Sequence, residues 1–580
     1  MIFSDGNGGL TMKKRSGRLT AAVLVARMLI SGCGSGFAKT KNGTAGAGEA
    51  GEMDISKRIK IDISGAQSFN DTNGDGYGEF EGWGTSLCWW ANRLGYSETL
   101  TEQSAKAFFD PAAGLGMNIG RYNIGGGDNV TDPDAPFYHE PHIKRSDSEV
   151  PGYCTDVVRI DLAAHTKEYY EENYTRADLE CGYAWNYDWD ADANQMNILK
   201  AAIKAAGDEY IAEAFSNSPP YFMTVSGCSS GGEDPGVDNL REDSYRAFAC
   251  YMADVIEHWK NEGLVFQSVS PMNEPATSYW KAHSDKQEGC HFSMGESQSK
   301  ILVELNKALA EKGLDIIISA SDETSIDTAA AAFEKLSDEA KAVIARIDTH
   351  AYQGTQRMLL KETAEKAGKN LWMSEVDGAE GMFSAGRSDT GMQAALGLAR
   401  AIITDLNGLK PTAWIMWDAV DIHVDSKNRF DTCSRSAADK IIGSGTPFWG
   451  IGIADHDTGE LLLGKKYYAF GQFSRYIRPG YCLVDSGDNT VAAFNPADQS
   501  IVIVAMNTSP DDKRWEFDLS DFDVPDGGRR ITAIRTSGTM ADGENWADVS
   551  DSVNTLISAD CVSFSANIKG SSITTFIISR

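Results

Sequence analysis

Basic residues are few relative to acidic residues in this chain. Its 580 residues contain 53 Lys and Arg against 83 Asp and Glu, which gives a formal net charge of -30 at pH 7. A protein with this charge repels the phosphates of nucleic acids, so the composition argues against a nucleic-acid partner. A neutral polymer such as a polysaccharide does not experience that repulsion.

The cysteines lack the spacing of a metal site. The chain has 10 cysteines, and none forms a CxxC pair or pairs with histidine at zinc-ligand spacing. We therefore expect no bound metal and no cofactor. Besides Cys33 the number is odd, so at least one thiol stays unpaired within a monomer. Pairs of Cys154 with Cys181 and of Cys228 with Cys290 are plausible disulfides, but sequence leaves the connectivity open.

The apolar run near the N-terminus is too short to span a bilayer. It covers residues 19–30, is interrupted by Arg27 and follows a cluster of basic residues. It ends in Ile30-Ser31-Gly32-Cys33, an arrangement typical of an export signal. These four residues resemble a bacterial lipobox, in which the cysteine is acylated and becomes the mature N-terminus. An ordinary secretory signal that is cleaved nearby is the alternative.

We expect residues 1–33 to be a signal and lipoprotein segment, with Cys33 as the lipidated residue and Met12 as a candidate start. Residues 34–56 are expected to be a flexible linker, because residues 40–52 are rich in Gly, Ala, Lys and Glu without hydrophobic periodicity. The mature protein would then leave the cytoplasm. It would be extracellular at the bacterial cell surface and contact the membrane only through its lipid anchor.

Strand-like and helix-like patterns alternate over residues 78–480. Apolar residues recur at helical spacing at Ile301, Leu302, Leu305 and Leu309, with Gly313 placed to end that helix. Eight alternations over roughly 400 residues predict an α/β fold, a (β/α)8 TIM barrel with insertions. The eight short apolar runs typical of buried strands lie at residues 80–84, 117–122, 210–215, 266–270, 315–319, 345–349, 370–374 and 412–417.

The largest insertion in this pattern covers residues 128–193 and follows the second strand. Loops that follow barrel strands line the active-site face, so Trp185, Tyr187 and Trp189 are candidates to shape a sugar cleft. A surface flap packed on itself is an equally good interpretation.

The pattern changes after Pro479 to short alternating runs separated by Asp, Gly and Ser turns. This pattern predicts a C-terminal β-sandwich over residues 481–580. Residues 59–63 are a candidate for an extra strand that returns to the sandwich, so residues 57–77 are assigned to an N-terminal strand joining it. The four runs after Pro479 lie at residues 490–494, 501–505, 530–535 and 573–578.

Two glutamates directly follow predicted strands. Glu274 lies in SPMNEP at residues 270–275, and Glu375 lies in LWMSEV at residues 371–376. In a barrel both carboxyl groups would project at the carboxyl ends of parallel strands, where active sites lie. Cleavage of a glycosidic bond needs one carboxyl group to protonate the departing oxygen and a second to attack or stabilise an oxocarbenium-like sugar. The pair therefore predicts a glycoside hydrolase.

One motif imitates a metal site. Residues 71–76, DTNGDG, match the first half of an EF-hand loop, but the position that should hold a bidentate glutamate is Gly82. A turn rich in Gly and Asp is therefore the favoured interpretation, with a calcium site as the alternative.

Several of these motifs carry a family resemblance. Asn273 before Glu274, with Glu375 after the seventh strand, resembles the retaining glycoside hydrolases built on TIM barrels. A sandwich built from both chain ends and the junction YYAFGQFSRYIRPG at residues 467–480 are similar to glycoside hydrolase family 30. This resemblance extends over residues 57–580. Three further segments resemble the endo-β-1,6-galactanase branch of that family: GWGTSLCWWA at residues 82–91, SNSPPY at 216–221 and QEGCHF at 287–292.

The resemblance implies roles for individual residues. Glu274 would be the acid/base, Glu375 the nucleophile, and Asn273 a hydrogen-bond partner of the sugar 2-hydroxyl. Arg121 would bind sugar hydroxyls or orient the nucleophile. For the remaining positions the alternative is a core or supporting residue. The remaining candidates for substrate binding are Asn217, His350, Tyr352 and Trp417, with Trp83, Trp89 and Trp90 as a candidate stacking platform.

The substrate implied by the resemblance is β-1,6-galactan, as in the side chains of arabinogalactan, cleaved by double displacement. An exo-acting β-1,6-galactobiohydrolase, or a family relative that acts on β-1,6-glucan or glucuronoxylan, is the alternative among enzymes. A non-catalytic surface glycan-binding lipoprotein is the alternative from another class. The presence of both glutamates argues against it, because a binding module has no need for acids at both positions.

Overall fold

A computed structural model of the chain describes residues 54–127, 150–284, 287–377, 392–429, 432–444 and 448–579. The expected signal segment with Cys33 and most of the expected linker lie outside these residues. Among the residues described, no helix combines the length and the hydrophobicity needed to cross a membrane.

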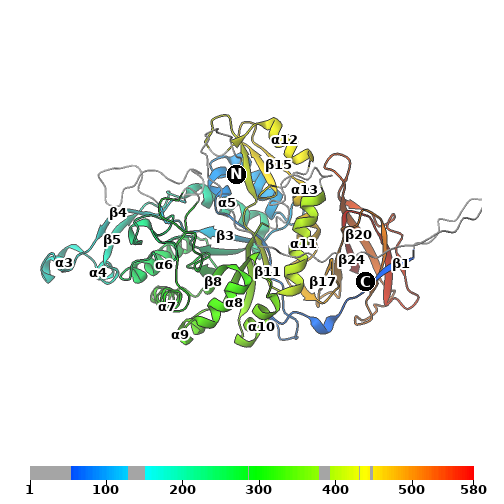
Figure 1. Ribbon diagram of the computed structural model, residues 1–580, viewed down its shortest axis with the longest axis horizontal. Helices are drawn as coiled ribbons and strands as arrows, with labels where there is room; N and C mark the ends of the chain where they lie inside the picture. Colours follow the sequence, from blue (N-terminus) through cyan, green and yellow to red (C-terminus); the bar gives the residue numbers. More distant parts are fainter. Residues whose placement is uncertain are drawn as a thin grey trace, which may run out of the picture. The chain divides into compact units, whose positions relative to one another are not determined.

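Eight parallel strands in the described part of the chain close into a barrel (Figure 1). Each overlaps one of the eight apolar runs, which confirms the predicted barrel. Side chains of β2 and β3 are buried throughout, as expected for parallel strands covered on both faces. Around the closed sheet the strands are β2 (Gly82–Ser86), β3 (Ile119–Asn123), β6 (Ile211–Phe215), β7 (Ser268–Ser270), β8 (Ile317–Ser325), β9 (Arg346–Gln353), β10 (Asn370–Val376) and β11 (Ala413–Met416).

Amphipathic helices alternate with these strands. In α7 the apolar residues Ile301, Leu302, Leu305 and Leu309 are buried, as their spacing predicts. The helices between and after the barrel strands are α1 (Trp90–Leu94), α2 (Glu98–Ser104), α5 (Ala193–Ala206), α6 (Tyr245–Asn261), α7 (Glu296–Glu311), α8 (Ile326–Lys335), α9 (Asp338–Val343), α10 (Arg357–Ala367), α11 (Met392–Gly408) and α13 (Lys465–Ser474).

Trp83 and Trp90 belong to the core, so their prediction as a sugar-stacking platform was wrong. Both side chains are 0% exposed. The indole N–H of Trp83 donates to the carbonyl of Ile477 at 2.7 Å, and its ring packs against Phe470 of α13. The Trp90 ring packs edge-on against Phe108. The Trp83 ring, between two glycines of β2, thus fills the space between this strand and α13.

The insertion after β3 contains a hairpin of β4 (Cys154–Arg159) and β5 (Tyr183–Tyr187), with α3 (Lys167–Asn173) and α4 (Arg176–Cys181) between them. Two of its aromatic residues face helix α6. The hydroxyl of Tyr187 donates to Asp254, and Trp189 stacks on His258 with ring centroids 3.8 Å apart. Trp185 packs against Tyr187 and Phe222. The interpretation of these rings as part of a sugar cleft is therefore corrected, because they pack within the insertion and against its supports.

The C-terminal strands form two packed sheets. The N-terminal strand β1 pairs in parallel with β19, so it joins this part of the molecule. It covers Ile55–Lys60, slightly earlier than the expected 59–63. Phe517, Phe564 and Phe576 pack between the sheets. One sheet has the order β16 (Cys482–Val484), β17 (Thr490–Phe494), β18 (Ile501–Asn507), β24 (Ser572–Ser579), β20 (Arg530–Ser537), β21 (Glu544–Asp548), and the other β1, β19 (Lys513–Asp518), β23 (Ser563–Ile568), β22 (Leu556–Ile557).

Lys465 connects the last barrel helix to this sheet pair. Its ammonium group donates to the carbonyl oxygens of Ser537, Thr539 and Glu544 at 2.8 to 3.1 Å, and to Asn545 Oδ1 at 2.6 Å. Burial lowers its pKa to about 8. These bonds tie the start of α13 to β20 and β21, as the junction motif implies.

A small sheet after β11 was not predicted from the sequence. It has the order β13 (Thr432–Cys433), β12 (Val420–Val424), β14 (Gly452–Asp455), β15 (Glu460–Leu463), and α12 (Arg435–Ser444) accompanies it. Figure 1 shows these elements in yellow. Trp449 directly precedes the turn into β14 and becomes important at the site described below.

Among the described residues, neither of the two disulfides considered from the sequence is formed, so both are corrected. Cys181 at the end of α4 faces Cys250 of α6 instead of Cys154. Cys228 lies with its sulfur 3.6 Å from His283 Nδ1 instead of pairing with Cys290.

The EF-hand-like segment forms a turn held by its own carboxylates. Asp71 accepts hydrogen bonds from the N–H groups of Gly74 and Gly76 at 2.7 and 3.1 Å. Asp75 accepts one from Tyr77 at 2.8 Å. This arrangement is the turn rich in Gly and Asp that the sequence favours.

Candidate active site

Glu274 follows β7 in a tightly held turn. Its backbone adopts a φ of 48°, in the left-handed region, and its N–H donates to the carbonyl of Asp322 at 2.8 Å. Its own carbonyl accepts hydrogen bonds from Thr277 Oγ1 at 2.8 Å and from Trp280 Nε1 at 3.1 Å. Such a costly conformation persists only where the surroundings fix it, and it is common at functional sites. The turn aims the Glu274 side chain into the end of the barrel.

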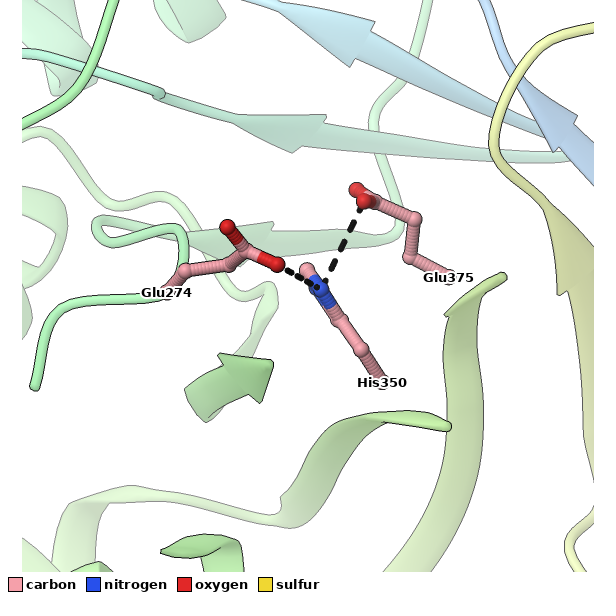
Figure 2. Close-up of side chains that lie close together, drawn as sticks. All are labelled: Glu274, His350 and Glu375. Atoms are coloured by element: carbon pink, nitrogen blue, oxygen red, sulfur yellow. Dashed lines mark hydrogen bonds and ion pairs between the residues drawn. The ribbon is translucent and has the colours of Figure 1, made fainter. Parts of the chain in front are cut away.

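Glu375 is the second to last residue of β10. Its carboxyl group is buried, with Arg121 Nη1 3.4 Å from Oε2 and the hydroxyl of Tyr352 donating to Oε1 at 3.2 Å. The pairing of β10 with β9 shifts register between Met373 and Glu375, so the simple alternation of a strand is interrupted just before Glu375. Glu375 points toward Glu274 from the opposite side of the site (Figure 2).

His350 of β9 lies between the two carboxyl groups (Figure 2). Its Nδ1 is 3.1 Å from Glu274 Oε1 and 3.4 Å from Glu375 Oε1. Ligand atoms of the three residues all lie within 4.8 Å of one another. The two glutamates found in the sequence thus meet within a few ångströms, although 101 positions separate them in the chain.

Arg121 of β3 is held in the barrel interior by carboxylates. It is 0% exposed, and its guanidinium donates to Glu213 at 2.9 Å, to Asp322 at 2.5 Å and to the carbonyl of Ser374 at 3.1 Å. A buried guanidinium is tolerated only with such partners. Arg121 therefore faces the Glu375 carboxylate from a fixed position, which fits an orienting role better than direct contact with a sugar.

Asp322 of β8 organises the floor of the site, and sequence reasoning missed it. Its carboxylate accepts from Arg121 and from Ser374 Oγ at 2.6 Å, and it lies 3.2 Å from His350 Nε2. This last contact is at ion-pair distance, but the N–H is not aligned for a hydrogen bond. The signal in the sequence was the polar run after the fifth apolar segment, SASDET at residues 319–324.

Burial and charge set the protonation of the cluster. Burial raises the pKa of Glu375 to about 7, and the charge of Glu274 adds to the rise. Burial alone would raise the pKa of Glu274, but the hydrogen bond and charge of His350 outweigh it and lower that pKa. Burial would likewise lower the pKa of His350, yet Glu375 and Asp322 hold it well above the ordinary value. Near neutral pH Glu274 is therefore ionised beside an imidazolium, and Glu375 is the carboxyl group that still takes up a proton.

Two predicted asparagines present unused oxygens. Asn273 and Asn217 are 2% and 1% exposed. Within the described residues, the Oδ1 atoms of both lack a hydrogen-bond partner. The amide nitrogen of Asn217 lies 3.4 Å from Cys88 Sγ, so its orientation is fixed. Buried polar atoms are normally paired, which makes these two oxygens candidates for contact with a polar ligand.

Aromatic rings cover the Glu375 side of the site. Trp89 and Trp417 pack edge to face with centroids 5.0 Å apart, and each is nearly buried. Trp449, which the sequence analysis missed, is half-buried and packs against this pair. Its ring centroid lies 6.2 Å from that of Tyr352. The structure thus brings Trp89 and Trp417 to the site and adds Trp449.

The same cluster has the atoms to hold a cation. Among the described residues, Glu274, His350 and Glu375 form the single group of acidic, His or Cys side chains that meets metal-ligand geometry. The positively charged His350 already occupies the space between the carboxylates. Two carboxyl groups at this separation, one able to keep a proton, can act as acid and nucleophile on one bond.

The chain is similar in sequence to several known proteins. A family model described as O-glycosyl hydrolase family 30 matches residues 165–429. An endo-β-1,6-galactanase of Hypocrea rufa is 30% identical over 517 residues, which is 87% of this chain and 92% of that protein. An exo-β-1,6-galactobiohydrolase of Bifidobacterium longum is 26% identical over 76% of this chain, but the match covers 34% of that longer protein.

A solved structure shows the same fold. The catalytic domain of a family 30 xylanase from Talaromyces cellulolyticus superposes with a TM-score of 0.61 at 17% identity. The alignment covers 90% of this chain and all of that one.

Proposed function

The chain belongs to O-glycosyl hydrolase family 30, and from that membership we propose that it hydrolyses β-1,6-galactan by double displacement. In this proposal Glu375 attacks the anomeric carbon while Glu274 protonates the departing oxygen. Glu274 then takes a proton from water, which releases the sugar from the covalent intermediate. Arg121 and Tyr352 would hold the Glu375 carboxylate for attack.

The spacing of the two carboxyl groups is the observation that carries the mechanism. Oxygen atoms of Glu274 and Glu375 lie within 4.8 Å of each other. Retaining glycosidases separate their carboxyl groups by about 5–5.5 Å, whereas inverting enzymes need roughly 6.5–9.5 Å for a water molecule. A gap this narrow favours direct attack by Glu375.

The proton of the carboxyl pair has to change sides for this chemistry. Burial favours the proton on Glu375, because His350 favours the ionised form of Glu274. The reaction needs the proton on Glu274 and the charge on Glu375. In this proposal a bound sugar displaces the contacts of His350 with the two carboxyl groups and so moves the proton to Glu274.

The choice of galactan is supported by the Hypocrea rufa enzyme, which matches almost along its full length and is called an endo-β-1,6-galactanase. The relative from Bifidobacterium longum is called an exo-β-1,6-galactobiohydrolase, which shares the sugar and linkage. The open oxygens of Asn273 and Asn217 and the rings of Trp89, Trp417 and Trp449 would contact the sugar. The second candidate function is hydrolysis of β-1,6-glucan or glucuronoxylan, after which other relatives are named.

A substrate panel tests this proposal. De-branched β-1,6-galactan is expected to be cleaved with a kcat/KM at least on the order of 100-fold above that for β-1,4-galactan, xylan or β-1,6-glucan, because unpaired buried polar atoms reject sugars that cannot bond them. Reducing-end assays and chromatography of the products provide the measurement. A ladder of oligosaccharides indicates endo cleavage, and galactobiose alone indicates exo cleavage. A preference for one of the other three polymers would refute the galactan assignment.

We also propose that Cys33 anchors the protein through a lipid at the cell surface. In a bacterial host the wild-type protein is expected in the membrane fraction, whereas Cys33→Ser should move most of it to the medium or the soluble fraction. Quantitative immunoblotting of the fractions measures this. Cys561→Ser is the matched control, since Cys561 lies in the C-terminal sandwich and should leave fractionation unchanged. Equal fractionation of wild type and Cys33→Ser would remove the anchoring claim.

A further inference from the structure

Tyr279 makes a contact with Glu274 that the family resemblance does not assign. Its hydroxyl donates a hydrogen bond to Oε2 of the Glu274 carboxyl group. The other oxygen of that group, Oε1, is the one that faces His350 at 3.1 Å. The two carboxyl oxygens of Glu274 thus have different partners on different sides.

Tyr279 also borders solvent, unlike Glu274 and Trp280, with which it is in contact. Its side chain is 41% exposed, whereas Glu274 is 6% exposed and the adjacent Trp280 3%. Trp280 packs edge to face against Tyr279 with centroids 4.5 Å apart. A Cβ atom at Gly289 would lie 2.1 Å from the Trp280 ring, so this indole has a fixed place. Tyr279 therefore presents a ring to the outside from a rigid support.

The side on which Tyr279 lies follows from the contacts of His350. His350 touches Glu274 Oε1 and Glu375, so Oε1 faces the sugar that Glu375 would attack. Oε2 and Tyr279 belong to the other side of the acid, where the departing sugar must leave. An exposed aromatic ring at that position suits the apolar face of a sugar.

We propose that Tyr279 is a positioning residue that fixes the Glu274 carboxyl group through Oε2 and forms the wall on the departing side of the bond. This inference rests on the proposed function of Glu274 as acid/base. The Tyr279 hydroxyl favours the ionised form of Glu274, because a hydrogen bond donated to a carboxylate stabilises its charge. It also keeps the acid aimed at the departing oxygen.

Several other titratable groups surround Glu274, and their charges also affect its pKa. The titratable and charged groups that face Glu274 come from four barrel strands and from its own loop: Arg121 of β3, Asp322 and Glu323 of β8, His350 and Tyr352 of β9, Glu375 of β10, and Tyr279 itself. None of these other groups changes in a Tyr279→Phe variant. A shift of the pH profile in that variant therefore reports the lost hydrogen bond.

The experiment compares pH profiles of kcat/KM for wild type, Tyr279→Phe and Tyr169→Phe. Tyr169 is the matched control, because it is 38% exposed on α3 of the insertion, away from the barrel strands. Loss of the donor raises the pKa of Glu274, so the alkaline limb of the Tyr279→Phe profile should move up by about one pH unit. Its kcat should fall on the order of 10-fold on a β-1,6-galacto-oligosaccharide but less than about 3-fold on the 4-nitrophenyl glycoside. Tyr169→Phe should match wild type.

A second variant covers the case in which Tyr279→Phe disturbs the loop. Site-specific 3,5-difluorotyrosine at position 279 keeps the ring and makes the hydroxyl a stronger donor, so the alkaline limb should move down. The inference would be overturned if the alkaline limb of the pH profile stayed at the wild-type pH in both variants. It would also be overturned if kcat of Tyr279→Phe fell equally on the oligosaccharide and on the aryl glycoside. A wild type that cleaves no glycan or aryl glycoside would instead refute the proposed function, so the two failures are distinguishable.

Discussion

Replacing Glu375 by Ala is expected to abolish turnover, with a loss on the order of 10⁴-fold or more in kcat. Among the described residues around the site, no other carboxylate lies opposite Glu274 with an Arg and a Tyr donor holding it. The variant retains the other partners of Arg121, namely Glu213, Asp322 and the carbonyl of Ser374, so the barrel should remain folded. Initial rates on β-1,6-galactan measure the loss, with far-UV circular dichroism as the check of folding.

The matched control is Glu365→Ala. Glu365 is an exposed residue of α10, where Lys361 forms an ion pair with it at 2.8 Å, so its removal should leave kcat unchanged. Time-resolved NMR of the first product adds a test of the pathway in the wild type. Double displacement at Glu375 should release the β anomer before mutarotation. An α anomer as the first product, or a near-normal rate for Glu375→Ala, would contradict nucleophilic attack by this residue.

The barrel could be predicted because parallel strands covered on both faces are apolar along their whole length. That signal located each of the eight strands to within a few residues, and it placed Glu274 and Glu375 at strand ends. Which end of a barrel carries the site follows from the fold alone. The fold class and the reactive pair were therefore within reach of local pattern.

The aromatic residues that line the site could not be predicted from the sequence, because packing decides their positions. In the sequence Trp83 and Trp90 look like Trp89, a tryptophan near the end of the first barrel strand. Their exposed fraction of 0% assigns them to the core. Whether an aromatic ring faces a helix or a cleft depends on the register of the strand against that helix, which local sequence does not encode. Trp449 was missed for the reverse reason, because a small sheet after β11 delivers it to the site.

The ionic contacts of the site were missed because they cross the barrel. Asp322 meets Arg121, which lies 201 positions away in the chain, and Ser374, which lies 52 away. Tyr279 reaches Glu274 across a turn that starts at Glu274 itself, whose φ is left-handed. A single sequence gives the residue types of such contacts but not their pairing.

Removal of the acid gives the second large effect. Glu274→Ala is expected to lower kcat on β-1,6-galactan on the order of 10³-fold, within the range that general acid-base catalysis contributes. The sugar-6-hydroxyl leaving group of galactan needs a proton, whereas 4-nitrophenolate leaves without one. The loss on the aryl glycoside should therefore be smaller in the step that forms the covalent intermediate, and hydrolysis of that intermediate should become limiting.

Added azide provides the decisive measurement. In the Glu274→Ala variant the space of the side chain is open beside His350, and a small anion can enter it and attack the glycosyl group on Glu375 without a base. Azide should raise the aryl glycoside rate on the order of 10-fold or more and yield the β-glycosyl azide, since two inversions restore the starting configuration. Azide should have no such effect on the wild type, whose Glu274 carboxylate repels the anion. In Glu375→Ala, which forms no covalent intermediate, azide can only displace the leaving group directly, and this single inversion would give the α-glycosyl azide. An α-glycosyl azide from Glu274→Ala, or a β-glycosyl azide from Glu375→Ala, would exchange the two roles and with them the identity of the acid that Tyr279 positions.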